Sequence, residues 1–314
     1  MSFGRLPPSP VFQRRPLPAN LPLVFDLDGV IVDVRKTYRL SYLQGIAWHL
    51  RHDLGVPLRS PLPASLAAVH RLKKHPGFNA PRDVVALLLR LSLRAAVAKG
   101  RKGFTDGDIG ALRWIGDALV RGHLDNWQQS TLAGLTTSQI HDVLALEQPD
   151  LALARSREMY VGSTDVHAVF AQESVMQVPG LWHKDVLLLD PQRPPPRRPL
   201  GIYTGRNRRE ALWLCKRFRY FSELTAEPHT LGLRAHDDGA VKPDGQPLRQ
   251  LLVHFQAENL LYIGDLPADR QAAMHASVAL GQILPTRRSR PWPQSTVAAR
   301  HIDDLLDAID APTP

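Results

Sequence analysis

The sequence predicts an α/β fold, with a doubly wound parallel sheet as its core and a large helical domain inserted into that core. Three short apolar runs each end in polar residues, as buried parallel strands do at their carboxyl ends; they lie at 23–25, 200–203 and 259–263. Between the first two runs, Leu, Ala, Arg and His recur at helical spacing and β-branched runs are rare. The length of 314 residues allows one core with such an insertion. The expected boundaries are 1–20 for a Pro-rich, disordered lead-in, 21–36 and 183–314 for the discontinuous core, and 37–182 for the helical domain.

The composition excludes several classes of protein. A single cysteine, Cys215, excludes a disulfide-stapled scaffold, and a hydrophobic content of 44% excludes a wholly disordered chain. No apolar run approaches the roughly 18 residues that a membrane span needs. Residues 1–20 also lack the apolar segment of a signal peptide. We therefore expect a cytoplasmic protein with no membrane partner.

The net charge of +9, from 39 Lys and Arg against 30 Asp and Glu, allows an anionic partner, but the excess of Arg together with 27 Pro is also typical of a coding bias without function. The basic residues nevertheless form short, scattered pairs such as Arg14-Arg15 and Arg287-Arg288, not one long run. A nucleic-acid partner is therefore not expected. A small phosphorylated metabolite is an equally good use for the charge.

The first strand and the insertion come next along the chain. The strand at 23–25 is followed by Asp26 and Asp28, and Gly29 permits a sharp exit from the strand. In the insertion, the spacing of apolar residues predicts helices over 38–50, 62–72, 82–97, 106–124 and 137–146.

After the insertion, strands and helices alternate, as in a parallel sheet. A strand at 186–189 precedes the Pro-rich loop 191–199 and the strand 200–203. Asn207 begins a capping box, so a helix should run to about residue 218. The remaining expected elements are a strand at 259–263, a helix from Pro267 to Ala276, a strand at 278–284 and a helix at 302–309.

The polar residues at the strand ends suggest the chemistry. Asp26, Thr204 and Asp265 follow three different strands, and ligands of open parallel sheets bind outside the carboxyl ends of the strands. Carboxylates without His or Cys suit a hard cation such as Mg²⁺. Asp26 is a candidate nucleophile, and Asp28 a candidate acid and base. Lys242 would supply positive charge to a bound phosphoryl group.

With these residues in order, the chain resembles the haloacid dehalogenase superfamily of Rossmann-like hydrolases. Its four motifs match Asp26-Leu-Asp28-Gly29-Val30, Thr204-Gly205, Lys242-Pro243 and Gly264-Asp265-Leu-Pro-Ala-Asp269. Two positions depart from the usual pattern. Val30 stands where many relatives have Thr, and Leu266 stands where Ser or Thr is frequent.

The resemblance implies a role for each matching residue. Asp26 would be the nucleophile and Asp28 the general acid and base, while Thr204 and Lys242 would bind the phosphoryl group. The implied Mg²⁺ ligands are Asp26, the backbone carbonyl of Asp28, Asp265 and Asp269, the last as a ligand or as support. The candidate substrate contacts are Gly205, Arg206, Lys73, Lys74 and Asn79.

Several of these residues also have plainer interpretations. Arg206 is as readily a structural ion pair as a phosphate contact. His49 and His52 are expected to pack or to lie at the surface, because no Cys or carboxylate completes a zinc pattern. Cys215 is expected to be buried and inert, and Asp33 to be a turn or capping residue.

The resemblance implies a Mg²⁺-dependent phosphatase of the phosphoglycolate-phosphatase-like branch, with the insertion as a helical cap. Such a cap acts as a lid that controls the access of water. A phosphomutase or phosphotransferase would share all four motifs, and a non-catalytic anion-binding or nucleic-acid-binding protein on the same fold is a third hypothesis. The substrate depends on cap side chains whose positions a sequence alone does not give.

Overall fold

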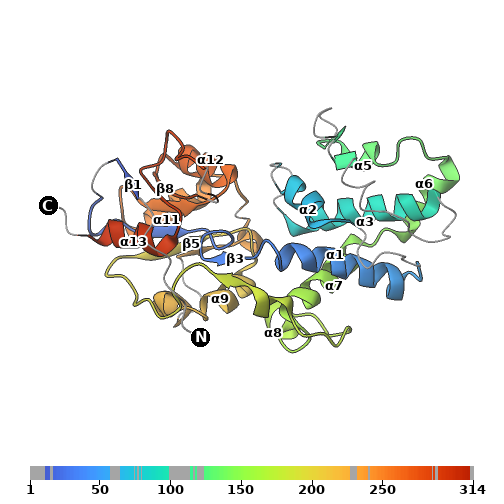
Figure 1. Ribbon diagram of the computed structural model, residues 1–314, viewed down its shortest axis with the longest axis horizontal. Coiled ribbons are helices and arrows are strands. Elements are labelled where there is room, and N and C mark those ends of the chain that lie inside the picture. The colour runs from blue at the N-terminus through green and yellow to red at the C-terminus, as the bar shows by residue number, and fades with distance from the viewer. Residues whose placement is uncertain are drawn as a thin grey trace. The chain divides into compact units, whose positions relative to one another are not determined.

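A computed structural model gives the fold of the chain (Figure 1). The structure describes residues 11–14, 17–56, 64–73, 75, 78, 80–98, 114–115, 117–118, 124–226, 232–239, 241–284, 286 and 289–311. The chain divides into two compact units, Met1–Asp33 with Val186–Pro314, and Val34–Asp185. Within the described residues, no helix combines the length and the apolar character needed to cross a membrane.

The first unit contains a mostly parallel sheet with the strand order β1-β9-β8-β7-β2-β5-β6. Its strands are β1 Phe12–Gln13, β2 Leu23–Phe25, β5 Leu200–Tyr203, β6 Leu233–Arg234, β7 Leu261–Gly264, β8 Ala279–Ile283 and β9 Val297–Ala299. Only β1 runs antiparallel, along β9. The flanking helices are α9 Arg208–Cys215, α10 Ser222–Ala226, α11 Gln246–Phe255, α12 Pro267–Ala276 and α13 Ile302–Asp310, with short 3₁₀ turns at Arg219–Phe221 and His236–Asp238.

Successive side chains along each strand point to opposite faces of this sheet, and both faces are buried. On one face, Val24 belongs to an apolar cluster that includes Leu248 and Leu251 of α11 and Ala272 of α12. On the other face, Phe25 packs edge-on against Tyr220 and Phe221, whose ring centroids lie 5.9 and 5.6 Å away. This arrangement explains why the strands read as continuous apolar runs.

Three features of this unit differ from the expectations. The lead-in 1–20 was expected to be disordered, which is wrong for Phe12–Gln13, because they pair with β9. The run 186–189 was expected to join the parallel sheet. Instead β4, Val186–Leu187, pairs antiparallel with β3, Val32–Asp33, in a separate two-stranded sheet. The predicted helix after Asn207 ends at Cys215, three residues before the expected position.

The second unit is helical in its described residues. Its elements are α1 Tyr38–Trp48, a π-helix His49–Asp53, α2 Leu66–Leu72, α3 Pro81–Ala98, α5 Trp127–Ser130, α6 Thr137–Leu146, α7 Pro149–Val161, α8 Val166–Phe170 and a 3₁₀ turn Leu181–Lys184. Helices α1 and α3 both pack against α7. The unit begins three residues before the expected position 37 and ends three residues after 182. Part of the predicted helix 106–124 lies outside the described residues.

A buried carboxylate, Glu158, anchors the segment that follows α8. Its Oε1 accepts hydrogen bonds from the hydroxyl groups of Ser163 and Ser174 at 2.8 Å and from the Met176 backbone N–H at 2.9 Å. The Val175 N–H donates to both of its oxygens. Burial raises the pKa of Glu158, but these hydrogen bonds outweigh burial and leave the pKa below its usual value.

We predict that Glu158→Gln destabilises the protein by about 3 kcal/mol, because the amide N–H₂ group would face backbone and hydroxyl donors. Since the folded-state pKa of Glu158 is lowered, its contribution is present above the usual glutamate pKa and is lost as the pH falls below it. Urea unfolding at pH 7 and pH 4 would measure this, with a smaller gap between variant and wild type at pH 4. Glu173→Gln, whose side chain is 92% exposed, is the matched control and should change little. Equal effects of the two substitutions would contradict the prediction.

Candidate active site and metal centre

The sheet brings three of the predicted site residues to adjacent strand ends. Strand β2 lies between β5 and β7, and Phe25 is in register with Ile202 and with Ile263. Asp26 follows β2 directly, Thr204 follows β5 and Asp265 follows β7. Because these strands are parallel, the three residues emerge at one edge of the sheet, as the sequence predicts.

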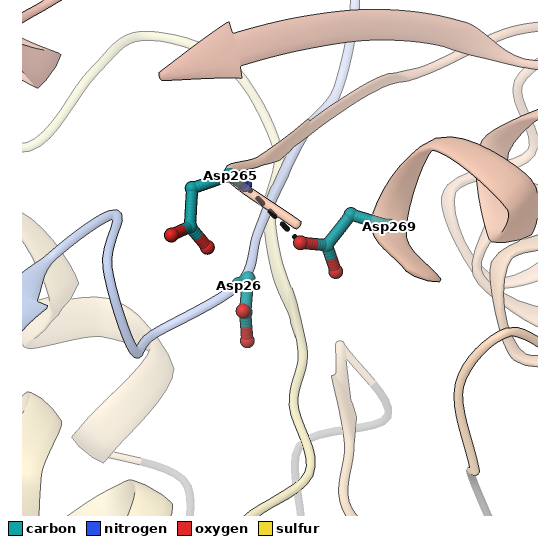
Figure 2. A group of neighbouring side chains, drawn as sticks. All are labelled: Asp26, Asp265 and Asp269. Atoms are coloured by element: carbon teal, nitrogen blue, oxygen red, sulfur yellow. Dashed lines mark hydrogen bonds between the residues drawn. The ribbon is translucent and has the colours of Figure 1, made fainter. Parts of the chain in front are cut away.

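Three carboxylates form a tight group at this edge (Figure 2). One oxygen from each of Asp26, Asp265 and Asp269 lies within 4.8 Å of the other two. Asp26 and Asp269 are buried, and the Oδ1 atom of Asp265 is buried with no hydrogen-bond partner among the described residues. Asp28, the fourth predicted metal residue, does not contribute its carboxylate to this group.

Lys242 bridges two of these carboxylates. Its Nζ lies 2.7 Å from Asp26 Oδ1 and 2.8 Å from Asp269 Oδ1. The same ammonium group lies 5.4 Å from the ring centroid of Tyr203 and 5.6 Å from that of Tyr262. Aromatic faces stabilise a cation at such distances, so the lysine is held on two sides by acids and rings.

Asp269 is the most heavily bonded residue of the group. Its Oδ2 accepts the backbone N–H groups of Asp265 and Leu266, at 3.1 and 2.9 Å. Its Oδ1 accepts the hydroxyl group of Tyr262 at 2.8 Å in addition to the contact with Lys242. These bonds fix the turn that carries Asp265. Of the two roles implied for Asp269, they favour support of the site. Tyr262 was not predicted, because a Tyr within an apolar strand carries no distinguishing pattern.

Crowding of the acids shifts their protonation. Burial raises the pKa of Asp26 to about 7, although Lys242 acts in the opposite direction. Burial, with the neighbouring Asp269 and Asp26, raises the pKa of Asp265 well above its usual range. Burial lowers the pKa of Lys242, but the two acids that it contacts outweigh burial and raise this pKa above its usual value. Lys242 contacts two of the three acids, so the group has a deficit of positive charge when all three acids are ionised.

The residues of this group fit a divalent cation. The donors are carboxylate oxygens, which suit Mg²⁺, and no His or Cys belongs to the group. The buried Oδ1 of Asp265 is an acceptor for which the described part of the chain offers no donor. A divalent cation would satisfy this oxygen and would favour the ionised form of Asp26.

Arg206, the residue that follows the second motif, holds Asp28. Arg206 is buried, and its Nε and Nη2 lie 2.9 and 2.8 Å from Asp28 Oδ1. Its Nη1 donates to Glu210 Oε1 at 2.7 Å, and its backbone N–H donates to the Thr204 hydroxyl at 3.2 Å. Of the two interpretations of Arg206, the structure shows the ion pair; its contact with substrate stays a prediction. Glu210 was not predicted as a partner of Arg206, because Arg206 lies before the first residue of α9 and the pair has no helical spacing to signal it.

The other predicted residues lie outside the carboxylate group. Gly205 is exposed, and beyond its chain neighbours no described residue has an atom within 4 Å of the place where a Cβ would stand, so its backbone is open to a ligand. Lys73 lies half-buried at the end of α2. Lys74 and Asn79 lie outside the described residues. Cys215 is buried as expected, and burial raises the pKa of its thiol.

The π-helix in the second unit holds the predicted histidines. His49 is fully buried, as its packing role predicts, and its Nδ1 lies 2.7 Å from Asp53 Oδ2. His52 is exposed and stacks on Trp48, with ring centroids 4.7 Å apart. Neither residue belongs to a metal-binding group in the part of the chain that the structure describes.

Solved structures similar to this chain are known. A phosphatase, Tt82 from Thermococcus thioreducens, is 17% identical, with 93% of this chain and 100% of that chain covered and a TM-score of 0.57. The X-ray structure of a Northeast Structural Genomics Consortium target is 15% identical, with 86% and 91% covered and a TM-score of 0.54. A haloacid dehalogenase superfamily hydrolase of subfamily IA from Geobacter sulfurreducens PCA is 15% identical, with 93% and 97% covered and a TM-score of 0.42.

At these identities the likeness is one of fold. It confirms the predicted Rossmann-like α/β class. The resemblance to the haloacid dehalogenase superfamily rests on the four sequence motifs. No protein-family model and no curated protein sequence matches the chain. The activity therefore has to be argued from the residues of the site.

Proposed function

We propose that this chain is a Mg²⁺-dependent phosphomonoesterase that hydrolyses a small organic phosphate through an aspartyl-phosphate on Asp26. The proposal rests on one observation: three buried or partly buried carboxylates form a group at the carboxyl edge of a parallel sheet, and a lysine contacts two of them. The fold likeness to a solved structure described as a phosphatase supports it as an analogy.

Asp26 is the nucleophile in this proposal. Its Oδ1 accepts hydrogen bonds from the Leu27 N–H at 2.8 Å and from Lys242, and among the described residues Oδ2 accepts no hydrogen bond. Oδ2 is therefore the oxygen available to attack phosphorus while the bond to the leaving oxygen breaks. Asp26 and Asp265 would hold Mg²⁺, supported by Asp269 and by the predicted carbonyl of Asp28, and the ion would supply positive charge to the phosphoryl oxygens.

Asp28 is the general acid and base. Arg206 holds its Oδ1, which leaves Oδ2 for proton transfer, and the side chain is 36% exposed. Asp28 would give a proton to the leaving oxygen and later take one from the water that hydrolyses the aspartyl-phosphate. Lys242 would neutralise the phosphoryl group, and the backbone at Gly205 and the Thr204 hydroxyl would donate to it.

The finer parts of the proposal concern the second unit and the branch. We assign the helical unit Val34–Asp185 as a cap that selects the substrate, with Lys73, Lys74 and Asn79 among its contacts. We also propose that the chain belongs to the phosphoglycolate-phosphatase-like branch and that it is located in the cytoplasm.

A screen of small phosphate esters tests the proposal. The full chain is incubated with each ester, with Mg²⁺ or with a chelator, and inorganic phosphate is measured. We expect Mg²⁺-dependent release from at least one ester of a small hydroxy acid or sugar. Transfer of the phosphoryl group to a second hydroxyl, seen by product analysis, would favour the phosphomutase alternative. Salt-dependent binding of nucleic acid without any phosphate release would contradict the proposal.

Gly29 gives a prediction about the shape of the site. Its φ is +85°, and a Cβ at this position would lie 2.6 Å from Cγ of Asp265. We expect Gly29→Ala to displace Asp265 and to lower phosphate release by about 10²-fold. Gly55 has a φ of +62°, and no atom of the described residues beyond its chain neighbours lies within 4 Å of its Cβ position, so Gly55→Ala is a control for backbone strain alone. Loss of activity in both variants to the same extent would contradict the role of the Asp265 contact.

A further inference from the structure

Two buried charged side chains, Arg206 and Glu210, lie behind Asp28, and each is only 2% exposed. Arg206 follows β5, and Glu210 lies in the first turn of α9. Arg206 Nη1 lies 2.7 Å from Glu210 Oε1, so Glu210 alone supplies the negative charge that a buried guanidinium group needs. The guanidinium group nevertheless reaches a second acid, Asp28, which is 178 residues away in the chain. Stability of the fold does not require this second contact.

The contact between Arg206 and Asp28 is directional. Nε and Nη2 of Arg206 lie 2.9 and 2.8 Å from the same oxygen, Asp28 Oδ1. The two donors belong to one rigid plane, so together they fix the carboxylate more closely than a point charge does. The Asp28 side chain is 36% exposed, and exposed side chains change rotamer rapidly unless a contact holds them. Arg206 is such a contact.

The residues behind Asp28 are themselves fixed to the backbone. The Arg206 N–H donates to the Thr204 hydroxyl oxygen at 3.2 Å, and the Arg206 carbonyl accepts the His236 N–H at 2.9 Å. The side-chain oxygen of Asn207 caps α9 by accepting the Glu210 N–H at 2.8 Å. The guanidinium group is therefore anchored to a strand end and a helix start. Rigid support of this kind is what holds a reacting group in productive geometry.

We propose that Arg206 and Glu210 are positioning residues: Glu210 holds the guanidinium group of Arg206, and Arg206 holds the Asp28 carboxyl group toward the leaving oxygen. The inference rests on the proposed function. As Asp26 Oδ2 bonds to phosphorus and the ester P–O bond breaks, the proton of Asp28 passes to the leaving oxygen, which departs as an alcohol. At 2% exposure neither positioning residue offers a surface to the substrate, so both affect the rate through Asp28.

The leaving group of the ester distinguishes this role from a structural one. Phenyl phosphate and 4-nitrophenyl phosphate have similar shapes, but nitrophenolate leaves readily without a proton, whereas phenolate depends on one. With Mg²⁺ and the full-length protein, Arg206→Lys should lower kcat/KM for phenyl phosphate about tenfold more than for 4-nitrophenyl phosphate, because an ammonium group lacks the planar fork. The ratio kcat/KM covers the steps up to departure of the leaving group, so slow hydrolysis of the aspartyl-phosphate does not mask the difference. Partial unfolding would lower both values equally.

A double variant tests Glu210. Glu210→Gln should lower kcat/KM for phenyl phosphate about threefold more than for 4-nitrophenyl phosphate, because the amide oxygen still accepts from Nη1 of Arg206 but carries no charge. Arg206→Lys combined with Glu210→Gln should be no worse than Arg206→Lys alone, since Glu210 acts only through Arg206. Losses that add in the double variant would overturn the assignment of Glu210.

Arg208→Lys is the matched control. Arg208 lies at the start of α9, and its acid partner, Asp238, lies 2.7 Å away and outside the candidate site. This variant should change kcat/KM for both esters equally or not at all. Equal losses on both esters in Arg206→Lys, or the same difference between the esters in Arg208→Lys, would overturn the inference and leave the proposed function standing. If the wild type releases phosphate from neither ester and from none in the screen of small phosphate esters, the proposed function fails and the inference fails with it.

Discussion

Asp26→Asn should abolish phosphate release, with a loss on the order of 10⁴-fold in kcat under saturating ester and Mg²⁺. An amide oxygen is a poor nucleophile, and the substitution also removes one of the three carboxylates that would hold the ion. The fold should persist, because an amide oxygen can still accept the hydrogen bond from the Leu27 N–H. Phosphate release and the Tm of the purified variant measure the two expectations together.

The matched control for this variant is Asp33→Asn. Asp33 lies in the same stretch of chain, on β3, and the sequence assigns it a local structural role. It should retain wild-type phosphate release. Substantial residual activity in Asp26→Asn would exclude Asp26 as the nucleophile. A fall of many degrees in its Tm would instead show that Asp26 is needed for the fold.

The sequence predicts the central strands and α12 well for a physical reason. The run ending at Phe25 is buried on both faces, so it is uniformly apolar, and Pro267 starts α12 where a proline is favoured. Edge strands lack this signal. Phe12–Gln13 and Val186–Leu187 are only two residues long, and their pairing depends on distant partners that local patterning does not contain.

The candidate site also has one part that the sequence predicts and another part that it does not. The motif residues that end β2, β5 and β7 are predictable, because parallel strands bring their carboxyl ends to one edge. The buried ion pairs are not predictable from motifs. That Arg206 holds Asp28, and that Tyr262 holds Asp269, depends on side-chain directions across 178 and seven residues of chain, which only the folded structure fixes.

Lys242→Met should reduce both stability and activity, the former by about 3–5 kcal/mol. The ammonium group contacts Asp26 and Asp269, so its removal leaves buried carboxylates without a compensating charge. Lys242 lowers the pKa of Asp26, and its loss would therefore raise that pKa above the value of about 7. A carboxyl group with a raised folded-state pKa contributes stability at low pH and loses it as the pH rises through that pKa. The deficit of Lys242→Met should therefore be larger at pH 8 than at pH 5.

Mg²⁺ provides the complementary measurement, because a divalent cation supplies the charge that the variant lacks. Addition of Mg²⁺ should raise the Tm of the wild type at pH 8 and should raise that of Lys242→Met by more. Lys242→Arg, which keeps the charge but not the shape, should lose less stability than the Met variant. If Lys242→Met is as stable as the wild type at pH 8 without Mg²⁺, the three acids are not ionised together. The charge deficit that argues for a metal at this edge of the sheet would then be absent.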